Sequence, residues 1–363
     1  MTTALPTLEE LLTKLNEVRG SDLHLKVGSP PAYRIDGSLH LSDLAVVTPQ
    51  NTETWADQLL PARAKEEFTR HNEADFAYGL ASLGRYRVNI YRQRGSINIV
   101  VRAVSPASQE ITELGLPEAV ERLCNEQRGL ALVTGPTGSG KSTTLGAMID
   151  RINSTRRANI ITLEDPIEIL HADKLSIVSQ REVGVDTESF SEGLRRVLRQ
   201  DPDVIFIGEM RDNETVEAAL RAAETGHLVL STLHTNDATE TVNRIVDYFP
   251  PHQQHQIRLM LASTLTGVIS QRLVPRADGN GRVPAVELLI NTERVFERIA
   301  DPARTHTLEE VMADGEYYGM QTFDQALLHL FSAGKVSFQD ALAHASHPTD
   351  FRLAAQSLGL RSA

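Results

Sequence analysis

The chain has 363 residues, a formal net charge of −12 at pH 7, 41% hydrophobic residues and one cysteine. This composition predicts a globular protein with room for two domains. The negative net charge argues against nucleic-acid binding over the whole surface. A single cysteine excludes an internal disulfide and a Cys-x-x-Cys zinc module, and no apolar run is long enough to span a bilayer, so we expect a soluble, cytoplasmic protein.

The first part of the chain predicts a small α+β domain over residues 1–105. The expected helices are 7–19 and 49–70, and the expected strands are 21–27, 32–35, 74–80, 85–92 and 96–104, with a hairpin turn at Asp36-Gly37. His24 is interpreted as a half-buried strand residue, because the sequence shows no cluster of partners that would make it a ligand.

Arginines are frequent on two neighbouring strands of this predicted domain: Arg85, Arg87, Arg92, Arg94 and Arg102. They form either a solvated face of the sheet or a basic face offered to a phosphate, and the residues alone leave both interpretations open. A polar segment at 106–115 predicts a linker, after which strands and helices alternate through 116–363. Such alternation is typical of an α/β domain with a mostly parallel sheet.

A glycine-rich segment begins this second domain. Residues 135–142 read Gly-Pro-Thr-Gly-Ser-Gly-Lys-Ser, a complete G-x-x-x-x-G-K-[ST] phosphate loop between an apolar strand at 129–134 and a helix at 141–153. The glycines turn backbone N–H groups toward a phosphate, Lys141 adds a cation near the β- and γ-oxygens, and Ser142 offers a hydroxyl to Mg²⁺. A turn without a ligand is disfavoured, because all four fixed positions are filled. The predicted nucleotide contacts are Gly135, Pro136, Thr137, Gly138, Ser139, Gly140, Lys141, Ser142 and Thr143.

Carboxylates follow the next two predicted strands. The strand at 159–163 ends in Glu164-Asp165-Pro166-Ile167-Glu168, and acids at this end of a parallel strand predict a role with Mg²⁺ and water for one of them, or else a charged loop with helix caps. The strand at 204–207 is followed by Glu209. A glutamate there orients or deprotonates the water that attacks a γ-phosphate; the alternative is a helix N-cap.

Two histidines accompany the next predicted strand, at 226–235. A strand that ends Thr-Leu-His-Thr beside a γ-phosphate site makes His234 a sensor candidate, and zinc is disfavoured because nothing completes a ligand set with His227. Beyond it the sequence predicts a helix at 252–270, strands at 268–274 and 283–290, and a helical tail over about 294–363. The apolar face of that tail, around Phe323 and Leu327, predicts core or subunit contact.

These motifs together resemble the secretion ATPases that drive type IV pili and type II secretion, and look most like the PilT family of pilus retraction ATPases. The resemblance rests on the phosphate loop, an "Asp box" at 161–171, a Walker B segment at 201–212 and a "His box" at 225–250, and covers nearly the whole chain. It implies a PAS-like N-terminal domain, a RecA-like P-loop ATPase domain, and a homo-hexamer with ATP between the two domains.

The resemblance also implies residue roles. Glu209 matches the catalytic glutamate, and Glu168 matches the Asp-box acid linked to Mg²⁺ and water. His234 and His227 match the His-box histidines, expected to contribute to catalysis and to nucleotide binding respectively. Arg87 and Arg102 match two N-domain arginines described as arginine fingers in this superfamily.

The expected function is a hexameric, ATP- and Mg²⁺-dependent motor for pilus retraction by pilin disassembly. Its implied partner is an inner-membrane platform protein, and indirectly pilin, with no membrane insertion of its own and no nucleic acid. Two features favour a retraction ATPase over an assembly ATPase. Assembly ATPases usually carry a tetra-cysteine zinc module, which one cysteine cannot make, and extra N-terminal sequence, whereas the predicted N-domain here begins almost at Met1. However, residues 295–299 read Val-Phe-Glu-Arg-Ile where retraction ATPases carry Ala-Ile-Arg-Asn-Leu, which keeps an accessory paralogue open. An assembly ATPase and a non-hydrolysing regulatory subunit are further alternatives.

Overall fold

The computed structural model describes residues 5–35, 37–80, 83–104 and 110–357. The chain divides into two compact units, of which the first is Met1–Pro106 with Glu168–Leu170 and the second is Ala107–Ile167 with His171–Ala363. The predicted junction around residues 105–106 falls at 105–109, outside the described residues, so the predicted boundary and linker stay predictions.

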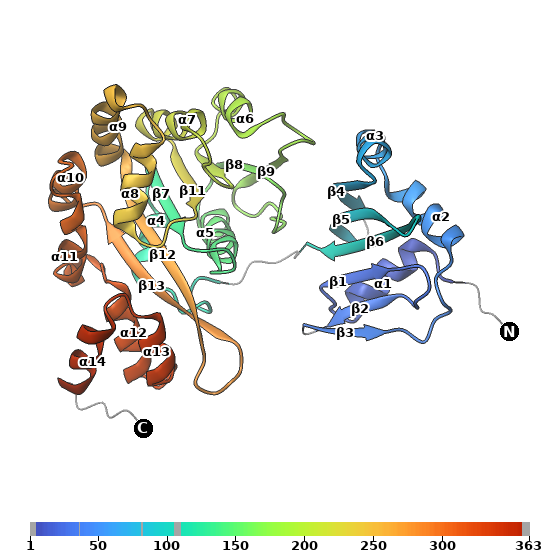
Figure 1. Cartoon of the computed structure of the whole chain (residues 1–363). Helices are drawn as coiled ribbons and strands as arrows, with labels where there is room; N and C mark the ends of the chain where they lie inside the picture. Colours follow the sequence, from blue (N-terminus) through green and yellow to red (C-terminus); the bar gives the residue numbers. More distant parts are fainter. Residues whose placement is uncertain (1–4, 36, 81–82, 105–109, 358–363) are drawn as a thin grey trace. The chain divides into compact units, whose positions relative to one another are not determined.

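The first unit is an antiparallel sheet packed against helices (Figure 1). Its strands lie in the order β3-β2-β1-β6-β5-β4. The strands are β1 (Asp22–Leu25), β2 (Ala32–Ile35), β3 (Ser38–Leu41), β4 (Glu73–Leu80), β5 (Gly84–Gln93) and β6 (Ser96–Ala103), and the helices are α1 (Leu8–Glu17), α2 (Pro49–Leu59) and α3 (Ala62–His71). Leu12 of α1, Trp55 of α2 and Ile99 of β6 are buried in one core, which accounts for the apolar spacing of the helices.

The structure bears on two predictions for this unit, the helix at 49–70 and the hairpin turn at Asp36. The single helix expected at 49–70 is wrong: α2 ends before Leu60, and α3 begins after Pro61. A residue that precedes proline is disfavoured in the helical conformation, and Leu60 adopts ψ 110° accordingly. The predicted turn residue Asp36 lies outside the described residues, but the hairpin of β2 and β3 around it is present.

The second unit contains a seven-stranded sheet in the order β13-β12-β7-β11-β10-β8-β9. All neighbouring pairs are parallel except β12 with β13. The strands are β7 (Gly129–Thr134), β8 (Asn159–Glu164), β9 (Ile177–Glu182), β10 (Val204–Ile207), β11 (Leu228–Leu233), β12 (Leu265–Pro275) and β13 (Arg282–Ile290). This arrangement confirms the predicted α/β class with a mostly parallel sheet.

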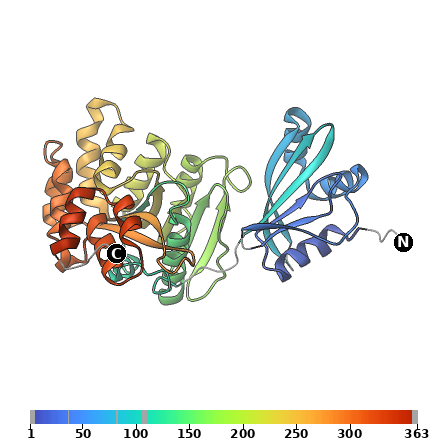
Figure 2. The same ribbon diagram turned by 60° about the horizontal axis from the view of Figure 1, so that its bottom comes forward.

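Helices cover both faces of this sheet (Figure 2). They are α4 (Glu118–Cys124), α5 (Lys141–Thr155), α6 (Phe190–Val197), α7 (Asn213–Glu224), α8 (Ala238–Asp247), α9 (Pro251–Thr264), α10 (Glu293–Ala300), α11 (Leu308–Ala313), α12 (Phe323–Ser332), α13 (Phe338–His344) and α14 (Pro348–Ser357), with short 3-10 turns at Thr305–Thr307 and Glu316–Tyr318. Successive residues of β7 serve opposite cores: Leu132 packs in the cluster of α7, whereas Val133 packs in that of α5.

The predicted helix at 252–270 is too long. Helix α9 ends at Thr264, and β12 begins at the next residue. Val268 and Ile269 pair in parallel register with Leu132 and Val133 of β7, so residues at the end of the apolar stripe extend the sheet instead.

The C-terminal helices pack on the long β12–β13 hairpin. Phe323, Leu327 and Phe351 share a buried cluster with Val274 and Val283, which confirms the core interpretation of that apolar face. The guanidinium of Arg272 on β12 lies 3.8 Å from the ring centroid of Phe323, and its Nη1 donates to the carbonyl oxygen of His344 at 2.7 Å. Strand β12 is therefore tied to the tail by both apolar and polar contacts.

A buried carboxyl on β13 predicts a pH-dependent stability. Glu287 is 4% exposed and accepts a hydrogen bond from the backbone N–H of Ala238 at 2.8 Å. Burial, reinforced by Asp237 and Glu309, raises the pKa of Glu287 to about 8 from 4.5. Between these values the native state keeps a proton that the unfolded state releases, so this group makes stability fall as pH rises through that window.

We therefore expect Glu287→Gln to be more stable than the wild type at pH 8, on the order of several degrees in Tm, and nearly equal to it at pH 4.5. Calorimetry of both proteins across this range measures the difference. Glu224→Gln, at an exposed position on α7, is the matched control and should follow the wild type. A Glu287→Gln protein with the wild-type dependence on pH contradicts the assignment.

Candidate functional site

The phosphate loop connects β7 to α5 and depends on its glycines. Gly135, Gly138 and Gly140 have φ values of +140°, +80° and +93°, a region that side chains rarely adopt. A Cβ atom at Gly135 would lie 2.5 Å from the carbonyl oxygen of Gln271 and 2.6 Å from Ser139 Oγ. The loop is thus pressed against β12 and closes tightly at its first residue, as the motif requires.

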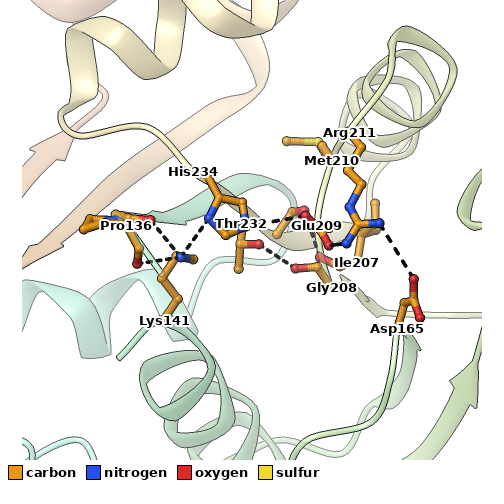
Figure 3. Close-up of polar contacts among 12 residues, drawn as sticks. Pro136, Lys141, Asp165, Ile207, Gly208, Glu209, Met210, Arg211, Thr232 and His234 are labelled. Carbon is orange, nitrogen blue, oxygen red and sulfur yellow. Dashed lines mark hydrogen bonds and ion pairs between the residues drawn. The ribbon is translucent and has the colours of Figure 1, made fainter. Parts of the chain in front are cut away.

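Lys141 places a cation at the centre of this loop. Its side chain is largely buried, and its Nζ donates to the carbonyl oxygens of Gly135 at 2.7 Å and Pro136 at 3.0 Å (Figure 3). The hydroxyl of Ser139 is also buried, with no hydrogen-bond partner in the described part of the chain. Ser142 and Thr143 are exposed in the first turn of α5. The loop therefore combines a held cation, a buried donor and exposed hydroxyls, a set that suits a phosphate chain.

Glu209 lies just beyond the carboxyl end of β10. The backbone there is fixed by its neighbours: Gly208 N donates to the carbonyl oxygen of Leu163 at 2.7 Å, and Thr232 Oγ1 donates to that of Gly208 at 2.6 Å. The Glu209 side chain is 16% exposed. One of its oxygens pairs with the guanidinium of Arg211, and the other lies 3.5 Å from His234 Nε2.

His234 lies between the cation and this carboxylate. It follows β11, and its Nδ1 is 3.5 Å from Lys141 Nζ while its Nε2 faces Glu209 (Figure 3). Three strands that are distant in sequence thus bring Lys141, Glu209 and His234 together at one edge of the sheet. The same histidine contacts a group on each side, which is the geometry expected of a sensor.

The structure separates His227 from this group. Strand β11 spans only Leu228–Leu233, so His227 precedes it and His234 follows it. The Nδ1 of His227 lies 2.9 Å from the carbonyl oxygen of Ala222, at the end of α7. The amino and carboxyl ends of a strand lie at opposite edges of a sheet. Within one chain His227 therefore lies at the opposite edge of the sheet from the phosphate loop, and its nucleotide contact stays a prediction.

The Asp-box carboxylates have different surroundings. Glu164, the last residue of β8, is buried and accepts hydrogen bonds from Thr162 Oγ1 at 2.6 Å and Gln180 Nε2 at 3.0 Å. Asp165 is exposed, and its Oδ2 lies 3.9 Å from a guanidinium nitrogen of Arg211. Glu168 is exposed and clusters with the first unit. Its role with Mg²⁺ stays a prediction.

Arg211 was not singled out by the sequence. Its hydrogen bond to Glu209 raises the pKa of the guanidinium, assisted by the charge of Asp165. The sequence shows that Arg211 lies two residues after Glu209. It does not show the contact with Asp165, because that contact depends on β8 and β10 being neighbours in the sheet. Arg211 therefore joins the site as a partner of the predicted catalytic glutamate.

In the first unit, two of the five arginines lie side by side. Arg87 of β5 and Arg102 of β6 are directly paired across the two strands. Like charges in such a position repel unless something compensates. Arg102 Nε donates to Asp22 Oδ1 at 2.8 Å, and the Asp22 side chain is only 4% exposed. Burial alone would raise the pKa of Asp22, but hydrogen bonds from Ser21 and Arg102 outweigh it and lower the pKa.

Two of the other three arginines have different surroundings. Arg92 lies 5.1 Å from the ring centroid of Phe68, and Arg94 occupies the turn between β5 and β6 with φ +51° instead of a strand. The basic pair is thus Arg87 and Arg102, both at least 42% exposed and oriented in part by Asp22.

Within the described ranges, no group of three or more His, Cys, Asp or Glu side chains is arranged to bind a metal ion. Among the same residues, no helix has the length and apolar character to cross a bilayer.

Comparisons with known proteins are consistent with this site. Residues 85–322 match the family described as "Type II/IV secretion system protein". The chain is 41% identical over 344 residues to the type IV pilus retraction ATPase PilT of Pseudomonas aeruginosa, covering 95% of this chain and 99% of PilT. It is 39% identical over 345 residues to the type IV pilus ATPase PilU of the same organism, covering 95% of this chain and 90% of PilU.

Solved structures give a similar result. The crystal structure of the pilus retraction motor PilT with bound ADP matches with a TM-score of 0.87 and 46% identity, over 95% of this chain and 99% of that chain. The ATPase DotB of Legionella pneumophila matches with a TM-score of 0.76 and 26% identity, over 98% of each chain. These matches confirm the α/β fold with a helical C-terminal region, whereas the PAS-like assignment of the first unit stays a prediction.

Proposed function

Because this chain belongs to the family of type II/IV secretion system proteins, we propose that it is an ATP-hydrolysing motor that powers the retraction of type IV pili. The observation that supports this most is the series Lys141–His234–Glu209, with 3.5 Å between neighbouring groups, at the mouth of a complete phosphate loop. The retraction motor PilT, 46% identical over 95% of this chain, was solved with bound ADP, which supports nucleotide binding at the corresponding loop.

In the proposed reaction, the backbone N–H groups of 135–142 and the Lys141 ammonium hold the β- and γ-phosphates. Glu209 orients a water molecule and accepts its proton as the water oxygen attacks the γ-phosphorus. The bond from phosphorus to the bridging β–γ oxygen breaks, leaving ADP and phosphate. His234 contacts both Lys141 and Glu209, so it responds to the change at the γ-position.

A magnesium ion fits the donors that the chain offers. The hydroxyl of Ser142 and the carboxylate of Glu168 are exposed oxygen donors, the type that Mg²⁺ prefers. We propose that Ser142 binds the ion directly and that Glu168 does so through water. When bound, Mg²⁺ neutralises charge on the phosphate oxygens.

The motor is proposed to act as a homo-hexamer in the cytoplasm. A closed ring satisfies contacts between identical subunits and lets residues of one subunit serve a site near its neighbour. The proposed partners are an inner-membrane platform protein and, through it, pilin. ATP is proposed to bind between the RecA-like domain and the N-terminal domain, where Arg87 and Arg102 would reach the β- and γ-phosphates.

This role for the arginine pair gives a quantitative prediction. We expect Arg87→Ala and Arg102→Ala each to lower kcat by about 10- to 10³-fold, because charge developing on the phosphate loses a bidentate cation. Arg102→Lys should recover only part of the rate. The measurement is steady-state ATPase, with ring formation and ATP binding measured separately.

Arg92→Ala is the control for this pair, since Arg92 lies on the same strand as Arg87 but packs over Phe68. It should retain the wild-type rate. Hydrolysis within twofold of wild type in both Arg87→Ala and Arg102→Ala would mean that the first unit takes no part in the chemistry.

A second candidate function is an accessory retraction ATPase. The chain is about as similar to PilU, at 39%, as to PilT, at 41%. In addition, residues 295–299 depart from the Ala-Ile-Arg-Asn-Leu segment expected of a retraction motor.

Pilus imaging in a deletion strain tests the proposal. Hyperpiliated cells that do not twitch indicate retraction, whereas bald cells indicate assembly. A strain that lacks every retraction ATPase then separates the two candidates. The chain expressed alone restores twitching if it is a complete motor, and restores it only together with a second retraction ATPase if it is accessory.

A further inference from the structure

Glu209 and His234, which are next to the phosphate loop through the contact of His234 with Lys141, also line a cavity of about 590 Å³. Its polar lining includes Glu209, Arg211, His234, Thr235, Arg244 and Tyr248, whereas no residue of 135–142 lines it. Glu209 and His234 therefore form a wall shared between the nucleotide site and this cavity.

The charged side chains of the cavity differ in whether they already have an ionic or hydrogen-bond partner. Arg211 is paired with Glu209. Glu240 is held on α8, where its Oε2 accepts hydrogen bonds from the backbone and side-chain nitrogens of Asn236 at 2.8 and 3.0 Å. Arg244, also on α8, has no ion pair among the residues that the structure describes. Its cationic group is thus the one in this cavity that is available to an anion.

Arg244 is nevertheless held in place. Its guanidinium lies 5.3 Å from the ring centroid of Tyr248, and the Tyr248 hydroxyl donates to the carbonyl oxygen of Met210 at 3.3 Å. Met210 follows Glu209 directly, so Tyr248 connects the cation to the segment that carries the proposed catalytic carboxylate. A guanidinium stacked on a ring keeps its N–H groups at its edge, where they can bind a phosphate bidentately.

We propose that this cavity is a phosphate-release subsite, in which Arg244 binds the inorganic phosphate formed at Glu209. The inference rests on the proposed hydrolysis. ADP remains in the phosphate loop after the terminal bond breaks, so the loop side is filled, and the phosphate passes the Glu209–His234 wall into the cavity. Phosphate then leaves by a path separate from that of ADP. His234, at the boundary, contacts both compartments.

The experiment measures binding of inorganic phosphate to the full-length, ADP-loaded protein by titration calorimetry. Arg244→Ala should weaken phosphate binding by about tenfold or more, the loss of a charge-assisted hydrogen bond. Arg244→Lys should lose less, because the charge remains. Arg221→Ala is the matched control: Arg221 is exposed on α7, paired with Glu217, and should bind phosphate as the wild type does.

A second titration with a non-hydrolysable ATP analogue identifies which phosphate Arg244 binds. A release subsite predicts that Arg244→Ala loses at least about tenfold more affinity for free phosphate than for the analogue. An equal or larger loss for the analogue means that Arg244 binds the γ-phosphate of ATP, and overturns the subsite. Unchanged affinity for both ligands also overturns it.

The outcome is separable from that of the proposed function. If the wild-type protein hydrolyses ATP and the Arg244→Ala variant binds phosphate normally, the motor assignment stands and the release subsite is excluded. If the wild-type protein does not hydrolyse ATP but its phosphate binding depends on Arg244, the anion site in the cavity stands and the motor assignment is excluded.

Discussion

Lys141→Ala is expected to abolish ATP turnover. Lys141 is the only cationic side chain in the phosphate loop, and its Nζ already lies between the carbonyl oxygens of Gly135 and Pro136. Alanine removes the cation that attracts the phosphate oxygens, in a buried environment where electrostatic interactions are strong.

The measurement is phosphate release by purified protein, with nucleotide affinity determined in parallel. Lys174→Ala is the matched control, because Lys174 is an exposed lysine of the same unit that pairs with Asp150. It should retain the wild-type rate. Near wild-type turnover in Lys141→Ala would falsify the assignment of residues 135–142 as the ATP site.

Glu209→Gln is expected to bind ATP but to hydrolyse it at least about a hundredfold more slowly, since an amide orients water poorly and accepts no proton. The substitution keeps the size of the side chain, which is 16% exposed between Arg211 and His234. Binding should therefore change much less than the rate. Single-turnover hydrolysis at saturating ATP measures the chemical step.

Glu214→Gln provides the comparison for Glu209→Gln. Glu214 is 63% exposed in the first turn of α7, near Arg195, and removing its charge should leave hydrolysis unchanged. The alternative interpretation of Glu209 is a structural cap. It would be favoured by a Glu209→Gln protein that loses ATP affinity but keeps the wild-type rate when saturated.

The parts of the site that the sequence predicted are those set by local spacing. The phosphate loop is contiguous, and its flanking strand and helix have strong apolar patterns, so its geometry follows from one segment. Glu209 was placed at a strand end for the same reason. The catalytic roles of these residues stay predictions, as do those of Arg87 and Arg102.

The parts that the sequence missed depend on contacts between distant segments. Strand β9 was not predicted because Ser179, Gln180 and Arg181 interrupt its apolar character, and it exists through pairing with β8 at the edge of the sheet. The cavity around Arg244 unites residues that follow β10 with residues of β11 and α8, and no local pattern marks it. The separation of His227 from His234 likewise depends on where the strand begins and ends, because β11 spans Leu228–Leu233 and so lies between the two histidines.

The strand β12 limits how freely this protein can be rearranged by engineering. Three successive residues have three different neighbours: Ser270 contacts Thr134 of β7, Gln271 contacts Thr144 of α5, and Arg272 contacts the ring of Phe323. The C-terminal helices are therefore not an exchangeable module. A chimera that imports them from a relative must also import compatible residues on β12, and those same residues must fit the recipient's phosphate loop. A functional exchange boundary consequently lies before β12 rather than after it.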